Sequence, residues 1–599
     1  MSRVSQAIGR VFSGGAKAFA RYPAAMFSAM IVAIAATALT ALDLPSDERL
    51  FTNMMLAFAA SALWGLAVAV ACGYCIGKQL PFVLINIITL LAGSGLFAYL
   101  YLLPDRTVPM IIMARIIASG LAAFIMFLLV ISADAGRSDY NQAAFMTLKS
   151  FLIAALYTIV ILLGLFFVAF TVQSLIYEDL SEKVFSYIAI WSLFLGFAFF
   201  LGYFPRFRRN EKDNRLDIAQ KHPAFAEILF AYVLVPIMFI LTVVMLIWAV
   251  QILIVGNWQE FELLASIFTA YSMFGVFLSI MISHYTQHIA TFYRRIFPFS
   301  ALVFLLFEAY AIYRQVAADG IKSSEYFICL FWLFALLAVL VLFSGKPVRN
   351  RLMAWIALVL TVLSVLPFTG YQSVSVYSQT ERLRVVLAKN DMIVDGAIVS
   401  APASISLADK IVITDAATFL MGNEYKNQVS AVWLSEKIKS GVTFKSIFGF
   451  SETYSEYNPE ENVTREIYLN LKSSAVEITG YDYAAVIAGD FEQPVEFNGA
   501  NGTYRVRFRN MNDARTPSIE VSRNDQVIIS QDFSMMIEGL IMKYEGQGEK
   551  NVTDVADMTA SFEVEGVRLM VVFQSMSIMI DVDGSFRTYM YPAAVYLGE

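Results

Sequence analysis

Residues 371–396, YQSVSVYSQTERLRVVLAKNDMIVDG, divide the chain into two parts of different composition. Before this stretch, long apolar runs follow one another from about residue 22, and after it there are none. A run of about 18 or more apolar residues can cross the hydrocarbon core of a membrane as a helix. A mean hydropathy of +0.63 also fits an integral membrane protein. The sequence therefore predicts a membrane region followed by a separate domain.

The hydropathy pattern predicts eleven membrane-spanning helices before residue 372. Each expected span holds about 20 predominantly apolar residues. The third contains Asn86 and a Gly93-Ser94-Gly95 sequence, so a partly re-entrant segment is an alternative there. The expected spans are 22–42, 53–77, 80–103, 108–133, 150–176, 184–204, 224–254, 262–283, 297–317, 325–344 and 352–371.

The basic residues of the connecting segments predict the orientation. With the N-terminus in the cytoplasm, the inner segments hold 18 Lys and Arg residues and the outer loops hold four. This asymmetry is typical of membrane proteins, whose cytoplasmic loops are enriched in Lys and Arg. An odd number of spans then places the C-terminal domain outside the cytoplasm.

Charge is also divided between the two parts. Residues 1–371 hold 24 Lys and Arg against 18 Asp and Glu, a net charge of +6. Residues 372–599 hold 19 against 31, a net charge of −12. An acidic domain is repelled by nucleic acid, so we expect no nucleic-acid partner.

The stretch after the last span is predicted to be a helix over 378–390. Ser378 is a plausible N-cap, and Glu381 three residues later completes a capping-box pattern. The expected organisation is a transmembrane helical domain at 1–371, a linker helix at 372–399 and an extracytoplasmic domain at 400–599.

The C-terminal domain is predicted to be α+β with a mostly antiparallel sheet. In TYRVRFRN at 503–510, apolar and polar residues alternate as they do in a half-buried strand. Helical patterns occur near 425–439 and 533–544, and Glu565-Gly566 and Asp583-Gly584 are predicted hairpin turns. Further strands are expected at 465–471, 518–522, 526–531, 558–565, 567–582 and 586–591.

Two ionisable residues fall inside expected spans. Arg115 lies in the fourth and Glu308 in the ninth. A charge at this depth is costly unless it is paired or hydrated. One hypothesis pairs Glu308 with Arg115, or makes Glu308 a proton or cation site. The alternative gives Glu308 a structural hydrogen bond and lets Arg115 extend to the membrane surface.

Other patterns give weaker signals. Arg505, Arg507 and Arg509 share one strand face, where they either meet an anionic ligand or pair with acids on neighbouring strands. His284 and His288 are four residues apart, a spacing that can hold a metal on one helix face, although no third ligand is nearby. We predict no catalytic, cofactor or metal site, since residues 372–599 contain neither His nor Cys.

Five stretches carry a family resemblance: HPAFAEILFAYVLVP at 222–236, RRIFP at 294–298, AIYRQVAADGIKSSEYF at 311–327 with Trp332, the linker at 373–398 and ITGYDY at 478–483. Over roughly 220–485 the chain resembles a bacterial membrane-protein family known only as domain of unknown function 4153. The linker residues Ser378, Gln379, Arg382 and Leu383 are the most specific part. The sequence departs at 322–325, with Lys-Ser-Ser-Glu where the family tends to Thr-Glu-Asn-Arg.

The resemblance implies a multi-spanning envelope protein and supplies no activity. We expect a bacterial cytoplasmic (inner) membrane protein with membrane lipids, and an envelope protein or lipid, as partners. The leading hypothesis is non-enzymatic binding, sensing or envelope assembly through the C-terminal domain. The alternatives are a transporter or channel that uses Glu308 and Arg115, and a membrane-embedded transferase.

Overall fold

The computed structural model divides the chain into two compact units, Met1–Ser451 and Glu452–Glu599. The described residues are 17–42, 48–75, 79–104, 108–133, 139–177, 180–205, 216, 219–255, 261–394, 396–402, 404–422, 424–426, 428–429, 431–439, 442–454, 465–472, 475–487, 494–511, 516–544, 550–552, 554–580 and 586–599.

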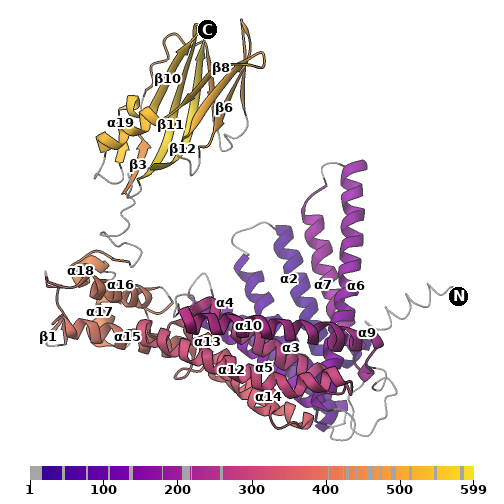
Figure 1. Ribbon diagram of the computed structural model, residues 1–599. Coiled ribbons are helices and arrows are strands. Elements are labelled where there is room, and N and C mark those ends of the chain that lie inside the picture. The colour runs from indigo at the N-terminus through magenta and orange to yellow at the C-terminus, as the bar shows by residue number, and fades with distance from the viewer. Residues whose placement is uncertain are drawn as a thin grey trace. The chain divides into compact units, whose positions relative to one another are not determined.

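The first unit contains a large helical region, shown in Figure 1 from indigo to magenta. Within the described residues, nine helices are long and apolar enough to cross a membrane. They are α2 (Pro23–Leu42), α3 (Glu48–Cys75), α4 (Gln79–Tyr101), α5 (Met110–Ile131), α6 (Tyr140–Leu175), α7 (Lys183–Tyr203), the continuous run α9 (Ala224–Glu227), η1 (Ile228–Leu234) and α10 (Val235–Val255), α12 (His288–Asp319) and α13 (Ser323–Leu342).

Two of the expected spans correspond to shorter apolar helices. In the described part of the chain these are Ser266–Met281, which belongs to α11 (Phe261–Met281), and α14 (Arg351–Leu363). The 13 residues of α14 rise about 20 Å, less than the roughly 30 Å of the hydrocarbon core. Helix length and composition thus support nine spans among the described residues.

The re-entrant alternative for the third span is wrong, because α4 is one unbroken helix. Asn86 is buried, but its carboxamide accepts a hydrogen bond from the backbone N–H of Ala24 at 3.1 Å and donates one to the carbonyl of Phe82 at 2.7 Å. The polar residue thereby satisfies a free N–H in the first turn of α2. Gly93 allows close packing, since a Cβ there would lie 2.8 Å from Ser61.

The linker helix α15 spans Tyr371–Lys389. It begins at the N-cap Gly370, so the predicted start at Ser378 is wrong. The hydroxyl of Ser378 has a different partner, described below. A short hairpin follows, β1 (Ile393–Val394) and β2 (Ala397–Ile398), and then α16 (Leu407–Met421), α17 (Val432–Lys439) and α18 (Phe444–Phe448). We call residues 371–451 the linker module.

One apolar core joins the parts of the linker module (orange in Figure 1). Its fully buried members include Leu383 and Leu387 of α15, Ile413 and Leu420 of α16, and Phe448 of α18. Because α15 shares this core with the residues after 400, the chain divides between Ser451 and Glu452 and not at the expected 400. The composition changes at residue 371, but the first compact unit continues to Ser451.

The second unit is built from two mostly antiparallel sheets (yellow in Figure 1). One sheet has the order β4-β12-β11-β3-β9 with β10 also on β11, and the other has the order β5-β6-β7-β8. Both contribute to one core with α19. The elements are β3 (Arg465–Leu471), β4 (Tyr483–Val486), β5 (Val495–Gly499), β6 (Gly502–Arg509), β7 (Ser518–Arg523), β8 (Gln526–Asp532), α19 (Ser534–Tyr544), β9 (Lys550–Val552), η3 (Val555–Met558), β10 (Thr559–Val564), β11 (Val567–Ile580) and β12 (Phe586–Gly598).

The expected antiparallel sheet is confirmed. In β6, Tyr504, Val506 and Phe508 are buried on the face that alternation predicts. Glu565 and Gly566 have φ of 51° and 79° at the hairpin between β10 and β11, as their turn sequence requires. The expected turn at Asp583-Gly584 lies outside the described residues.

Candidate functional site: a charged joint at the linker helix

The turn between α12 and α13 is the base of the site. Gly320 ends α12 with a φ of 70°, which a residue with a side chain rarely adopts, and its N–H donates to the carbonyl of Val316 at 3.0 Å. At the start of α13, the carboxylate of Glu325 accepts a hydrogen bond from the N–H of Lys322 at 3.1 Å. The end of α12 at Gly320 and the hydrogen bond between Glu325 and Lys322 fix a short turn at 320–322.

One face of α15 is hydrogen-bonded to this turn. The Ser378 hydroxyl accepts from the N–H of Ile321 at 2.8 Å, and the Gln379 side chain donates to the carbonyl of Asp319 at 2.8 Å. Gln379 is fully buried. A Cβ on Gly320 would lie 2.9 Å from Nε2 of Gln379, so the glycine also permits the close approach of α15.

Four charges from three elements complete the joint. Arg382 bridges two acids, with Nη2 3.2 Å from Asp319 Oδ1 and Nη1 2.5 Å from Asp415 Oδ2. Lys322 Nζ lies 2.6 Å from Asp415 Oδ1. Two acids and two bases therefore join the α12–α13 turn, α15 and α16 into one neutral cluster, which we call the joint.

The neighbouring charges of the joint change the pKa of Asp415. Burial acts to raise the pKa of its carboxyl, but hydrogen bonds from Lys322 and then Arg382 outweigh this effect and hold the pKa below its usual range. Asp415 therefore stays ionised. The same face of the module is tied to α13 by a 2.7 Å hydrogen bond between Ser323 and Tyr425.

All four linker residues that the sequence singled out take part. Ser378, Gln379 and Arg382 bind the turn, and Leu383 is fully buried in the core of the linker module. Lys322 and Glu325, where the chain departs from the family pattern, have structural partners here. Asp319 and Gly320 lie in the quoted stretch 311–327, whereas nothing in the sequence marked Asp415.

The pairing of Glu308 with Arg115 is wrong. Arg115 is exposed, and its Nε donates to the carbonyl of Val365 at 3.4 Å. Glu308 is fully buried, and its Oε1 accepts from the Thr269 hydroxyl at 2.6 Å. Its Oε2 is buried without a hydrogen-bond partner in the described part of the chain.

The basic stripe is largely neutralised by neighbouring acids. Arg505 pairs with Glu496 at 2.6 Å and also with Asp525, and Arg509 lies 3.1 Å from Glu520. Two of the three arginines thus follow the cross-strand alternative. Arg507 is exposed on β6 opposite Glu520.

The two histidines do not share a helix face, so the expectation that they lie one turn apart on one helix is wrong. His284 lies in the turn after α11, and His288 is the first residue of α12. The Nε2 of His284 is 3.3 Å from an oxygen of Asp139, the N-cap of α6.

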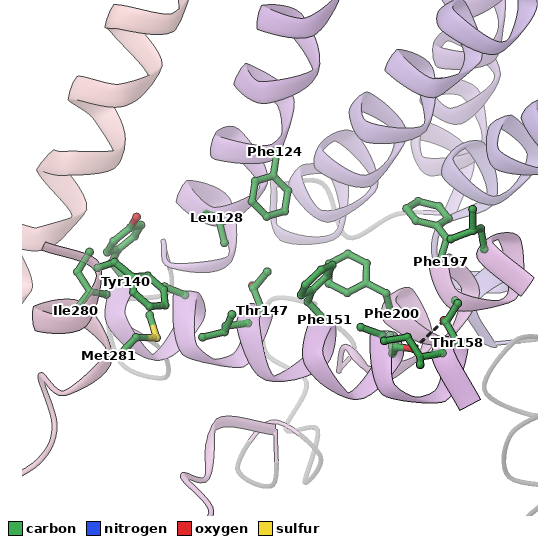
Figure 2. A pocket seen from close by; sticks show the side chains of 18 residues that line it. Phe124, Leu128, Tyr140, Thr147, Phe151, Thr158, Phe197, Phe200, Ile280 and Met281 are labelled. Atoms are coloured by element: carbon green, nitrogen blue, oxygen red, sulfur yellow. Dashed lines mark hydrogen bonds between the residues drawn. The ribbon is translucent and has the colours of Figure 1, made fainter. Parts of the chain in front are cut away.

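An apolar groove of about 830 Å³ lies along α6, with walls from α5, α7 and α11. Figure 2 shows Phe151 and Thr158 of α6 near Phe200 of α7, with Tyr140 of α6 at the other end of the groove near Ile280 and Met281 of α11. The hydroxyls of Thr147 and Thr158 bond to carbonyls of their own helix, so little polar surface faces the groove.

Comparison of the chain with known protein families, curated proteins and solved structures gives no match to any of them. The resemblance to domain of unknown function 4153 therefore stays a prediction.

Proposed function

We propose that the protein is a non-enzymatic component of a bacterial cytoplasmic membrane that presents its C-terminal sheet domain outside the cytoplasm to an envelope partner. In this proposal α11 and α14 complete eleven spans, and the linker module lies at the outer end of α12. The domain binds its partner, and the helical region anchors it.

The joint is the observation that carries this proposal. Six residues, Asp319, Lys322, Ser378, Gln379, Arg382 and Asp415, are engaged in holding the linker module to the α12–α13 turn. A flexible tether would need no such contacts. A built connection favours a role in which the position of the linker module relative to the membrane helices matters.

The charge of the second unit narrows the class of partner. Residues 452–599 hold 11 Lys and Arg against 24 Asp and Glu, a net charge of −13. The acidity expected for the whole tail thus belongs to this unit. We propose that the partner is a protein with a basic surface, because complementary charge speeds and orients association.

Site-specific photocrosslinking in cells tests the proposal. A photoreactive residue replaces Val486, which is 84% exposed on β4, in the full chain. The expected result is one crosslinked envelope protein whose yield falls when Arg382→Gln breaks the joint and is unchanged in the exposed control Arg384→Gln. In a second test, a reporter enzyme that works only in the cytoplasm is fused after Glu599. Activity of this reporter would contradict the proposed orientation. Turnover of an envelope substrate by the purified protein would contradict a non-enzymatic role.

One observation favours transport as a second candidate. The buried carboxylate of Glu308 has one oxygen without a hydrogen-bond partner among the described residues, as a proton or cation site would have. The two cavities described here are not lined by Glu308, however. Flux in proteoliposomes that is abolished by Glu308→Gln, with the protein still folded, would support transport over anchoring.

A further inference from the structure

A polar cavity of about 470 Å³ lies at the start of α12, at the end of this helix opposite the joint. Its walls come from the end of α11, the first turns of α12, the end of α13 and the chain that follows α13. Arg294 and Arg295, from the RRIFP stretch, and Lys346 supply its charge. Among the described residues that line the cavity there is no Asp or Glu.

The positive charge in this cavity is uncompensated. Arg294 is held by neutral acceptors, the carbonyl oxygens of Ser283 at 2.5 Å and Tyr285 at 2.8 Å. Arg295 and Lys346 are exposed, and neither forms an ion pair within the described part of the chain. Three like charges so close together repel one another unless an anion lies between them.

One buried hydroxyl of the cavity also has no hydrogen-bond partner among the described residues. Ser283 is only 7% exposed, and its hydroxyl has no partner among the described residues. Guanidinium and ammonium groups donate and do not accept. A ligand with several acceptor oxygens and a negative charge, such as a phosphate group, would satisfy this set of donors.

One wall of the cavity is apolar. Phe299 of α12 and Phe343 after α13 pack edge to face with ring centroids 4.9 Å apart, and they are 61% and 39% exposed. Both residues adjoin helices long and apolar enough to span a membrane. The cavity therefore joins a basic polar pocket to a surface suited to acyl chains.

We propose that this cavity binds the phosphate group of an anionic phospholipid, with the acyl chains against Phe299 and Phe343. Basic pockets between membrane helices bind phospholipid headgroups in this way. The same donors would also bind free inorganic phosphate, which has no acyl chains. The inference goes beyond the proposed function and does not depend on it.

Binding of lipid to the purified full-length protein in detergent tests the proposal. Phosphatidylglycerol, phosphatidylcholine and inorganic phosphate are the three probes. The variant is Arg295→Gln with Lys346→Gln, which leaves the Arg294 contacts in place. We expect the variant to lose roughly thirty-fold in affinity for phosphatidylglycerol, about five-fold for each charge removed.

Two matched controls separate the cavity from general basicity. Arg349→Gln removes an exposed charge just after Lys346 that does not line the cavity, and Arg314→Gln removes one near the other end of α12. Both should keep wild-type affinity. Binding of inorganic phosphate that is lost in the double variant would also support the site, with the free anion as its source. Equal binding of all probes by wild type and variant, or an equal loss in Arg349→Gln, would overturn the proposal.

Discussion

The two ends of α12 carry similar numbers of charges in opposite arrangements. At the Asp319 end, two acids and two bases form one cluster with N–O distances of 2.5 to 3.2 Å. At the Arg294 end, three cations line a cavity that has no acid among its described residues. The charges of the first arrangement are paired with one another, and those of the second have no acidic partner in the described part of the chain.

This difference separates a structural role from a binding role. Charges that are removed from water need partners, and at the joint each has one supplied by another element of the protein. Charges that repel one another are costly to the fold and are kept where an outside ligand neutralises them. The following substitutions test this comparison, from the largest expected effect on stability to the smallest.

Arg382→Gln should destabilise the linker module most. The change removes the bridge between Asp319 and Asp415, whose side chains are 43% and 35% exposed. We expect the opening free energy of α16 to fall by about 2 kcal/mol, less than for a fully buried pair. Hydrogen exchange of the α16 amides in the full-length protein measures this.

Arg384→Gln is the control on the same helix. Arg384 pairs with Glu381 at 2.5 Å, but both side chains are about half exposed, at 51% and 44%. Water screens such an exposed pair, so it contributes much less to stability than the partly buried pairs of the joint. Equal losses from the two variants would show that the joint does not hold the module.

Gly320→Ala should be the next most harmful change. Its φ of 70° strains any side chain, and the new Cβ would meet Gln379 at 2.9 Å. Gly345→Ala is the matched control, since its φ is 62° but nothing lies within 4 Å of the new Cβ. We expect losses of about 1.5 kcal/mol and about 1 kcal/mol in the thermal unfolding of the two variants. Equal losses would mean that α15 is not in close contact with the turn.

Acid should loosen the linker module through Asp415. Its pKa is lower in the folded chain, because hydrogen bonds from Lys322 and Arg382 outweigh burial. A group of this kind stabilises the fold above its unfolded pKa, about 3.9 for Asp, and this stability is lost as the pH falls through the folded pKa. Hydrogen exchange of α16 should therefore quicken below about pH 4.

Two variants test whether Asp415 causes this pH dependence. Asp415→Asn should weaken the module at neutral pH and show a smaller further loss in acid. Asp391→Asn, an exposed position after α15, should keep the wild-type pH profile. An unchanged profile in Asp415→Asn would exclude this carboxylate as the source.

Arg295→Gln with Lys346→Gln should have the smallest effect on stability. These exposed side chains have no ion pair to lose among the described residues, so the unfolding free energy should stay within about 0.5 kcal/mol. Thermal unfolding without lipid measures this. A loss as large as that of Arg382→Gln would mean that the cavity, like the joint, is structural.

Local patterns predicted much of the fold. The apolar runs located the helices, and alternation located β6 with its buried face. The helix α16 was missed, although Ser406 accepts a hydrogen bond from the N–H of Asp409, the capping pattern that marks such a start. The β-branched residues within 411–414 obscure its helical period.

The candidate site was predicted only in part. Ser378, Gln379 and Arg382 were singled out, but their partners were not, since a polar side chain gives no sign in the sequence of where its hydrogen-bond partner lies. The expected pair of Glu308 and Arg115 failed for the same reason, because Glu308 bonds to Thr269 and Arg115 bonds to Val365. Two charges inside apolar helices need partners, but not one another.

The sequence alone determined that a polytopic helical region precedes an acidic, mostly antiparallel sheet domain, because apolar length and alternation are properties of neighbouring residues. Only the tertiary structure decided that the division falls after Ser451, that Asp319, Arg382 and Asp415 meet, and that Arg295 and Lys346 line one cavity. These contacts join residues far apart in the chain, so they form only when the helices that carry these residues pack together.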